Sequence, residues 1–169
     1  MLETEVKIKV DQIEPYHNRL KSLGAECIHP RCYEENILYD FSQNELFHKN
    51  QALRLRRINK KSFLTFKEAP QKSRQFKIRN EFETEVKNSK EIKKILKSLG
   101  MKPAFEYRKH RTVYKKKRIK ICLDETRIGH FIELEGPQSD IVQFARSLGF
   151  SRKEFIKEDY ITLFRRQKD

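Results

Sequence analysis

The chain has 169 residues, of which 37% are charged, and 38 Lys and Arg against 24 Asp and Glu give a formal net charge of +14. This length suits one domain with a substantial core, and the excess of positive charge predicts an anionic partner such as a nucleic acid or a polyphosphate. No apolar run approaches the roughly eighteen residues that a membrane-spanning helix needs. Because the N-terminus also lacks a signal-peptide pattern and three cysteines suit a reducing compartment, we expect a cytoplasmic protein without a membrane partner.

Apolar and polar residues alternate along eight stretches, which is the pattern of half-buried β-strands. The expected strands are 2–10, 32–41, 51–58, 62–68, 75–87, 104–115, 118–124 and 129–136. Amphipathic helices are expected behind the N-cap candidates Asp11 and Ser89, and a final helix is expected over about 153–166. Strands mainly in hairpin order, closed so that no edge is exposed, predict an α+β fold: an eight-stranded antiparallel β-barrel with helices packed outside.

Two short motifs repeat along the chain. Glu-Thr-Glu-Val-Lys occurs at 3–7 and 83–87, and Leu-Lys-Ser-Leu-Gly occurs at 20–24 and 96–100, with a looser copy that ends at Gly149. Each copy indicates an acidic strand and an amphipathic helix that stops at a glycine in the C′ position. We therefore expect residues 1–169 to form a single domain built from two related halves, about 1–75 and 76–150, plus a C-terminal helix.

Each expected strand has one apolar and one charged face, because successive side chains of a strand point to opposite sides. Arg54 and Arg56 lie opposite Leu53 and Leu55, for example. Such faces are either ordinary solvated surface or the lining of the barrel interior. Solvated faces usually mix Ser, Thr, Gln and Lys, whereas these are mostly Glu, Asp and Arg, and the helices need the apolar faces for packing. We favour the interior, where carboxylates would hold a divalent metal and cations an elongated polyanion, because buried charges need partners.

The ordered motifs on these faces resemble the CYTH family, the triphosphate tunnel metalloenzymes. They are Glu3-x-Glu5-x-Lys7, Arg54-x-Arg56, Thr65-x-Lys67, the acidic strand from Glu81 to Glu85, Lys109-x-Arg111, Asp124 and Glu133-x-Glu135. The segment from Leu123 to Gly136 is most similar to the class IV adenylate cyclase branch. The resemblance implies Mg²⁺ or Mn²⁺ as cofactor, bound by Glu3, Glu5, Asp124, Glu133 and Glu135. It implies a substrate held by Lys7, Arg54, Arg56, Lys67, Arg79, Lys109 and Arg111, and catalytic roles for Lys67, Glu83 and Glu85.

Three functions are compatible with these residues. The first is a divalent-metal-dependent phosphohydrolase that acts on inorganic tripolyphosphate or on an organic or nucleoside triphosphate. The second is a class IV adenylate cyclase that converts ATP to cyclic AMP and pyrophosphate, and it is disfavoured because no motif for a base pocket is found. The third is a basic nucleic-acid-binding module, supported by the net charge and by the run Lys115–Arg118, although that run reads first as a solvated hairpin turn. We expect a triphosphate-bearing small molecule as the partner, not a nucleic acid, and a monomer or homodimer.

Overall fold

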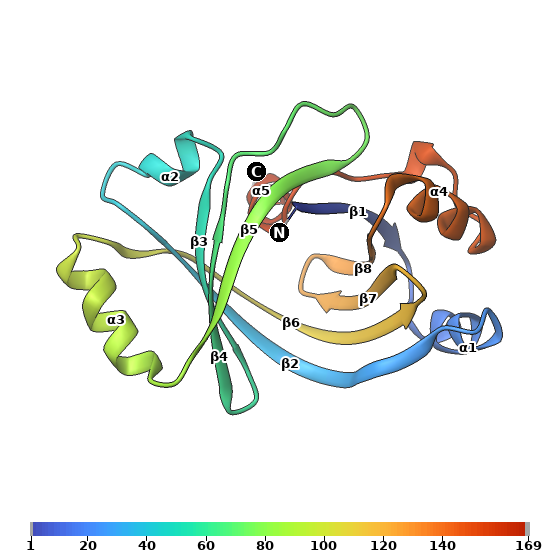
Figure 1. Cartoon of the computed structure of the whole chain (residues 1–169), viewed down its shortest axis with the longest axis horizontal. Helices are drawn as coiled ribbons and strands as arrows, with labels where there is room; N and C mark the ends of the chain where they lie inside the picture. The colour runs from blue at the N-terminus through green and yellow to red at the C-terminus, as the bar shows by residue number, and fades with distance from the viewer. Residues whose placement is uncertain (1, 168–169) are drawn as a thin grey trace. The chain divides into compact units, whose positions relative to one another are not determined.

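The computed structural model describes residues 2–167 of the chain, and its strands form a closed antiparallel barrel in the order β1-β5-β4-β3-β2-β6-β7-β8. Figure 1 labels the elements. The strands are β1 (Leu2–Val10), β2 (Glu26–Asp40), β3 (Ala52–Ile58), β4 (Lys61–Lys67), β5 (Lys77–Val86), β6 (Lys102–Lys116), β7 (Ile119–Thr126) and β8 (Gly129–Glu135). The helices are α1 (Glu14–Ser22), α2 (Glu45–His48), α3 (Ser89–Ser98), α4 (Gln138–Ser147), the 3₁₀ turn η1 (Arg152–Glu154) and α5 (Tyr160–Arg166). The predicted eight-stranded antiparallel barrel is confirmed. Within residues 2–167, no helix is long and apolar enough to cross a membrane.

The predicted helix over 153–166 is wrong in its first half. After η1 the chain is extended, and Ile156 exchanges backbone hydrogen bonds of 2.8 Å with Lys7 of β1 before α5 begins at Tyr160. Because every backbone N–H and C=O needs a partner, pairing with β1 replaces the helical bonds that this segment would otherwise make. The amphipathic pattern detected the helix, but a strand far away in the sequence decided where it starts.

The helix starts also differ from those predicted. The N-cap of α1 is Ile13, not Asp11, and Pro15 lies in its first turn. The N-cap of α3 is Asn88, whose side chain accepts hydrogen bonds from the N–H groups of Lys90 (3.1 Å) and Glu91 (3.2 Å), so the prediction of Ser89 is off by one residue.

The helix ends agree with the prediction. Gly24, Gly100 and Gly149 follow α1, α3 and α4 with φ of +74°, +83° and +94°. This left-handed conformation costs glycine little, since it has no Cβ.

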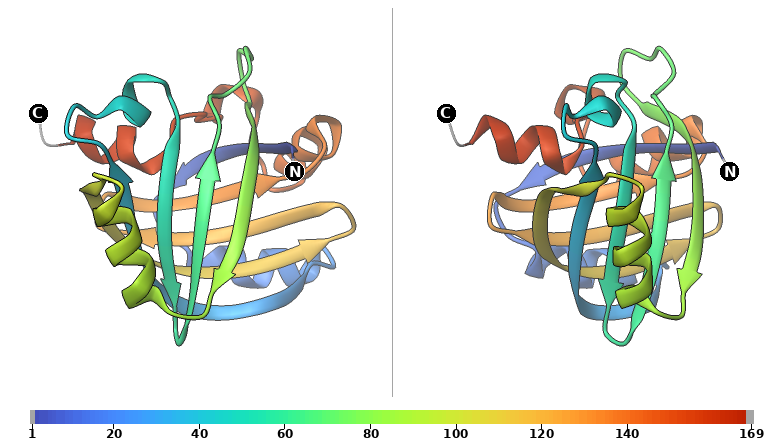
Figure 2. Two further views of the ribbon diagram at one scale, coloured as in Figure 1. Left: turned by 60° about the vertical axis from the view of Figure 1, so that its left-hand side comes forward. Right: turned by 90° about the vertical axis from the view of Figure 1, so that its left-hand side faces the viewer.

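The chain folds into two compact units of interleaved segments. The first, which we call the β3–β4 unit, comprises Tyr33–Gln71 and Arg79–Arg108. Its helix α3 lies against the strands (Figure 2), where Leu96 contacts Tyr39 and Leu55. The apolar face of these strands is therefore covered by helix, and the face with Arg54 and Arg56 is turned away from it.

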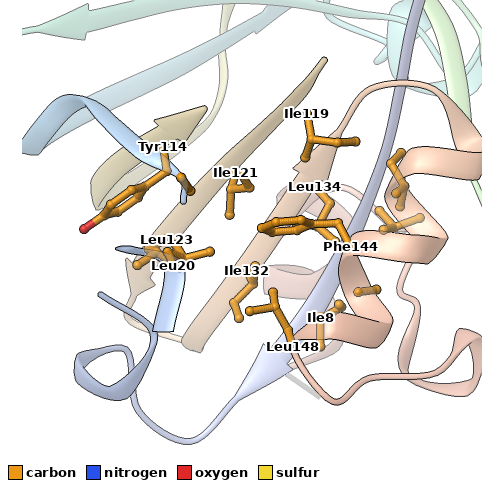
Figure 3. Packing of buried hydrophobic residues seen from close by; sticks show 14 of the residues in the cluster. Ile8, Leu20, Tyr114, Ile119, Ile121, Leu123, Ile132, Leu134, Phe144 and Leu148 are labelled. Carbon is orange, nitrogen blue, oxygen red and sulfur yellow. The ribbon is translucent and has the colours of Figure 1, made fainter. Parts of the chain in front are cut away.

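The second unit, which we call the β7–β8 unit, comprises Glu3–Cys32, Lys72–Ile78 and the chain from Lys109 onward. The helices α1 and α4 pack on the apolar face of its strands (Figure 3). The core residues labelled there are Ile8, Leu20, Tyr114, Ile119, Ile121, Leu123, Ile132, Leu134, Phe144 and Leu148. Fully burying one such aliphatic side chain contributes about 1.5–3 kcal/mol, so the apolar face of these strands is strongly favoured to pack against the helices. A shift of register by one residue would bring the charged face against the helices instead.

Candidate functional site

Asp124 of β7 lies at the centre of the charged face of the β7–β8 unit, with a side chain that is 0% exposed. Arg111, its register partner on β6, donates to the two carboxylate oxygens from Nε (2.6 Å) and Nη2 (2.5 Å). Lys109 donates from Nζ at 3.0 Å. Burial alone would raise the pKa of Asp124, but Arg111 and Lys109 outweigh it, and the pKa lies below its ordinary value. Asp124 is therefore an ionised carboxylate held by two cations.

Oppositely charged side chains continue to alternate from β7 across β8 to β1. Arg111 Nη2 lies 2.9 Å from Glu133 Oε1, and Lys7 Nζ lies 3.3 Å from Glu133 Oε2 and 2.9 Å from Glu5 Oε1. Lys7 and Glu133 are register partners in the β1–β8 pairing, which explains why they meet. Burial opposes the ionised form of Glu133, but Arg111 and Lys7 lower its pKa well below the usual range. We call the set Glu3, Glu5, Lys7, Lys109, Arg111, Lys120, Asp124, Glu133 and Glu135 the β7–β8 charge cluster.

Glu135 differs electrostatically from Asp124 and Glu133. Lys120 lies 2.5 Å from its Oε2, yet burial raises the pKa of Glu135, and the negative charges of Glu3 and Glu133 add to that effect. A further cation near this carboxylate would favour its ionised form. Glu3 is half-buried on β1, and Glu5 is the register partner of Glu135.

Tyr160 contacts the β7–β8 charge cluster and was missed by the sequence analysis. Its hydroxyl donates a 2.5 Å hydrogen bond to Asp124 Oδ2, and its ring centroid lies 4.8 Å from Lys109 Nζ and 5.2 Å from Lys7 Nζ. No local signal could have found this contact, since it depends on where α5 meets the strands.

The predicted metal ligands are carboxylates, the ligand type that suits a divalent cation. Hard carboxylate oxygens are what Mg²⁺ and Mn²⁺ prefer, and the environment of Glu135 would be relieved by added positive charge. Among residues 2–167, however, no three His, Cys, Asp or Glu side chains gather closely enough to hold an ion. Asp124 and Glu133 instead engage Lys and Arg. The carboxylates are therefore the right type of ligand for Mg²⁺ or Mn²⁺, but Asp124 and Glu133 form ion pairs with neighbouring cations.

The β3–β4 unit carries a second charged face, built around Arg54 and Arg56. Arg56 Nη2 donates to both carboxylate oxygens of Glu83 (3.1 and 3.0 Å), and Arg54 Nη2 lies 3.7 Å from Glu83 Oε2. Thr65 donates from Oγ1 to the same oxygen at 2.5 Å. Burial opposes ionisation of Glu83, but chiefly Arg56 and Thr65 lower its pKa, so it is a carboxylate at neutral pH. Its side chain is still 36% exposed and can be reached from solvent.

Lys67 and Arg79 continue this face toward the other end of the strands. Both contact Glu81, Lys67 through Nζ and Arg79 through Nε at 3.3 Å. Glu85 does not join them: its side chain is 49% exposed and pairs with Lys61 Nζ at 3.2 Å. We call the set Glu34, Arg54, Arg56, Thr65, Lys67, Arg79, Glu81 and Glu83 the β3–β4 charge cluster.

The sequence analysis also missed the contribution of β2 to this face. Glu34 Oε1 lies 3.8 Å from Arg56 Nη1, and Asn36 is the register partner of Arg56. Both side chains are almost fully buried. The alternation of Glu34, Asn36 and Leu38 with Glu35, Ile37 and Tyr39 was a usable signal, because Ile37 and Tyr39 supply the apolar face.

The comparisons with known proteins agree with this architecture. A family model described as CYTH domain matches residues 1–160. The chain belongs to the CYTH family. A Methanocaldococcus jannaschii protein named "putative adenylate cyclase" is 29% identical over 174 residues, covering 96% of this chain and 98% of the relative.

Solved structures show the same fold. A Vibrio parahaemolyticus protein of the same name has a TM-score of 0.85 at 20% identity, with 97% of this chain and 98% of that chain covered. A Hippeastrum protein, titled as a cyclase candidate with a dominant triphosphatase activity, has a TM-score of 0.68 at 18% identity, with 98% and 96% covered. At these identities the two structures support the fold, not a shared substrate.

Proposed function

We propose that this CYTH-family chain is a divalent-metal-dependent phosphohydrolase that acts on a triphosphate, and that the cations of its charge clusters bind phosphate oxygens. The observation that carries this proposal is that Lys7, Arg54, Arg56, Lys109 and Arg111 are all largely buried on the charged faces of their strands. Burying so many cations is costly unless they serve an anion, because each ion loses its hydration. Membership in the family supports the triphosphate as that anion.

The arginines of the β3–β4 charge cluster are suited to grip adjacent phosphate groups. Arg54 and Arg56 are two residues apart on β3, so both guanidinium groups share one face, and each can donate two parallel hydrogen bonds to phosphate oxygens. Glu83 holds both of them in the absence of a ligand. An incoming phosphate would take its place, which leaves the Glu83 carboxylate available to orient a water molecule. Lys67 would act as a point charge on the transferred group.

The carboxylates Glu3, Glu5, Asp124, Glu133 and Glu135 would hold the metal. Mg²⁺ or Mn²⁺, when bound, supplies positive charge that neutralises phosphate oxygens. Phosphoryl transfer depends mainly on such charge stabilisation and on in-line positioning. Lys7, Lys109 and Arg111 pair with Glu5, Asp124 and Glu133 and would move to phosphate oxygens of the substrate.

Hydrolysis is favoured over cyclisation by the position of Glu83. It is an ionised, solvent-accessible carboxylate beside the phosphate-binding arginines, which is what a water-orienting residue requires. Glu85 is a weaker candidate, since it pairs with Lys61 away from the arginines. The second candidate function, an adenylate cyclase, is supported by the name of the Methanocaldococcus jannaschii relative.

Analysis of products separates these functions. The chain is incubated with tripolyphosphate, ATP or thiamine triphosphate and Mg²⁺ or Mn²⁺, and products are resolved by chromatography. We expect metal-dependent release of phosphate. Cyclic AMP with an equal amount of pyrophosphate would establish the cyclase instead. A nucleic-acid-binding module would show no metal-dependent turnover and a steeply salt-dependent affinity for DNA or RNA; the burial of the clustered cations argues against it.

A further inference from the structure

Asn36 is a buried polar side chain without a hydrogen-bond partner. It is 1% exposed, and within residues 2–167 neither its Oδ1 nor its Nδ2 has a partner. Buried amides in proteins are nearly always paired, because an unpaired buried donor or acceptor costs about 1–3 kcal/mol. A side chain of this kind on the face of a binding site is a candidate for a contact that forms only with the ligand.

The register of β2 and β3 places Asn36 on the substrate-binding face. Asn36 is opposite Arg56, and residues directly opposite in an antiparallel pair point to the same side of the sheet. The contact of Glu34 with Arg56 confirms the face, since Glu34 is two residues from Asn36. Asn36 therefore lies beside the arginines that we assign to phosphate binding.

The charged face of β2 is unlike that of β3. Along it the chain presents Glu34, Asn36 and Leu38, an acidic, a neutral and an apolar residue, all buried. Phosphate groups would be repelled by Glu34 and gain nothing from Leu38. A neutral group with apolar surface, such as a sugar or a base, suits this face, while the phosphates suit the arginines of β3.

The hydrogen-bonding capacity of the Asn36 amide also favours a sugar or a base as its partner. Tripolyphosphate offers almost only acceptors at neutral pH, so it can satisfy Nδ2 of Asn36 but leaves Oδ1 buried and unpaired. A hydroxyl, or a base edge that carries a donor beside an acceptor, satisfies both atoms, as when asparagine pairs with adenine. We propose that Asn36 hydrogen-bonds the organic part of the substrate and makes the chain prefer an organic triphosphate over inorganic tripolyphosphate. This inference rests on the proposed function.

The experiment compares wild type with Asn36→Leu, which replaces the amide with an apolar side chain of similar volume. Affinities for ATP and for tripolyphosphate are measured by calorimetric titration in metal-free buffer, so that no turnover interferes. We expect ATP to bind about tenfold more weakly to the variant and tripolyphosphate to change by less than about twofold. Asn18→Leu, at an exposed position of α1, is the matched control and should change neither affinity.

The thermal stability of the unliganded variant gives an independent measurement. Removing an unpaired buried amide should leave the melting temperature unchanged or raise it, whereas removing an amide that holds the fold together should lower it. If Asn36→Leu does not fold, Asn36→Ala is titrated in the same way. Comparing ATP with 2′-deoxy-ATP and inosine triphosphate shows whether the sugar or the base contacts Asn36.

Equal losses for ATP and tripolyphosphate, no loss for either, or a folded Asn36→Leu variant with a lowered melting temperature would overturn the inference. Failure of the proposed function is distinguishable: in that case wild type itself binds neither ligand. If wild type binds both and Asn36→Leu retains the same ratio of affinities, the triphosphate site stands and only the role of Asn36 is rejected.

Discussion

Substitution of Arg56 by alanine should weaken triphosphate binding far more than substitution of a surface cation. Arg56 is largely buried and is held by Glu83 and Glu34 in the unliganded chain. A bound phosphate therefore gains a charge-assisted, two-pronged contact but must first displace Glu83. The net contribution of Arg56 is the difference between these two interactions.

The expected magnitude follows from that exchange. Truncating one partner of a buried charge pair at an interface costs about 2–5 kcal/mol. Because Glu83 already compensates Arg56 and is itself 36% exposed, we expect the lower part of that range, about 2–3 kcal/mol or roughly 30- to 150-fold in affinity. The melting temperature should fall, because the buried Glu34 loses the guanidinium beside its Oε1, whereas solvent screens the partly exposed Glu83.

Calorimetric titration with tripolyphosphate at two salt concentrations provides the assay. Lys93→Ala is the matched control, because Lys93 is exposed on α3 and should influence mainly the association rate and its salt dependence. Lys116, in the basic run expected to be a solvated turn, is unsuitable, since it is partly buried and donates to the backbone carbonyl of Leu23. Equal losses for Arg56→Ala and Lys93→Ala would refute a specific arginine site and favour diffuse surface binding.

Three further predictions concern the β7–β8 charge cluster. Glu135→Gln or Glu5→Gln should abolish Mg²⁺-dependent phosphate release while circular dichroism shows an intact fold; wild-type turnover by either variant would reject the metal assignment. Asp124→Asn should lower the free energy of unfolding in denaturant at pH 7 by about 3–5 kcal/mol, because two buried cations lose their counter-charge. The lowered pKa values of Asp124 and Glu133 contribute stability above about pH 4, and it should be lost as the pH falls through their folded-state values. A melting temperature that does not fall between pH 5 and about pH 2 would contradict this. Tyr160→Phe should cost about 1.5–3 kcal/mol in chemical denaturation, since the ring stays and only the hydrogen bond to Asp124 is removed; an unchanged midpoint would show that this bond contributes nothing.

The faces of the strands were predictable from the sequence because alternation is a local property. Arg54 and Arg56 must share a side once β3 is extended, whatever the strand pairs with. The registers confirm this, pairing Arg54 with Thr65 on β4 and Arg111 with Asp124 on β7. The glycine helix ends were also predictable, since the left-handed turn is set by the residue itself.

Only the tertiary structure decided which charges meet. From the sequence, Glu83 and Glu85 share one strand face and were equally good candidates for a catalytic role. In the structure Glu83 forms an ion pair with Arg56, whereas Glu85 forms one with the exposed Lys61. Tyr160 reaches Asp124 because the segment before α5 pairs with β1, a contact between residues more than a hundred positions apart. Whether two side chains form an ion pair or a hydrogen bond depends on differences of about a few tenths of an ångström in the distance between them. Composition and periodicity do not encode such distances between strands that are far apart in the sequence.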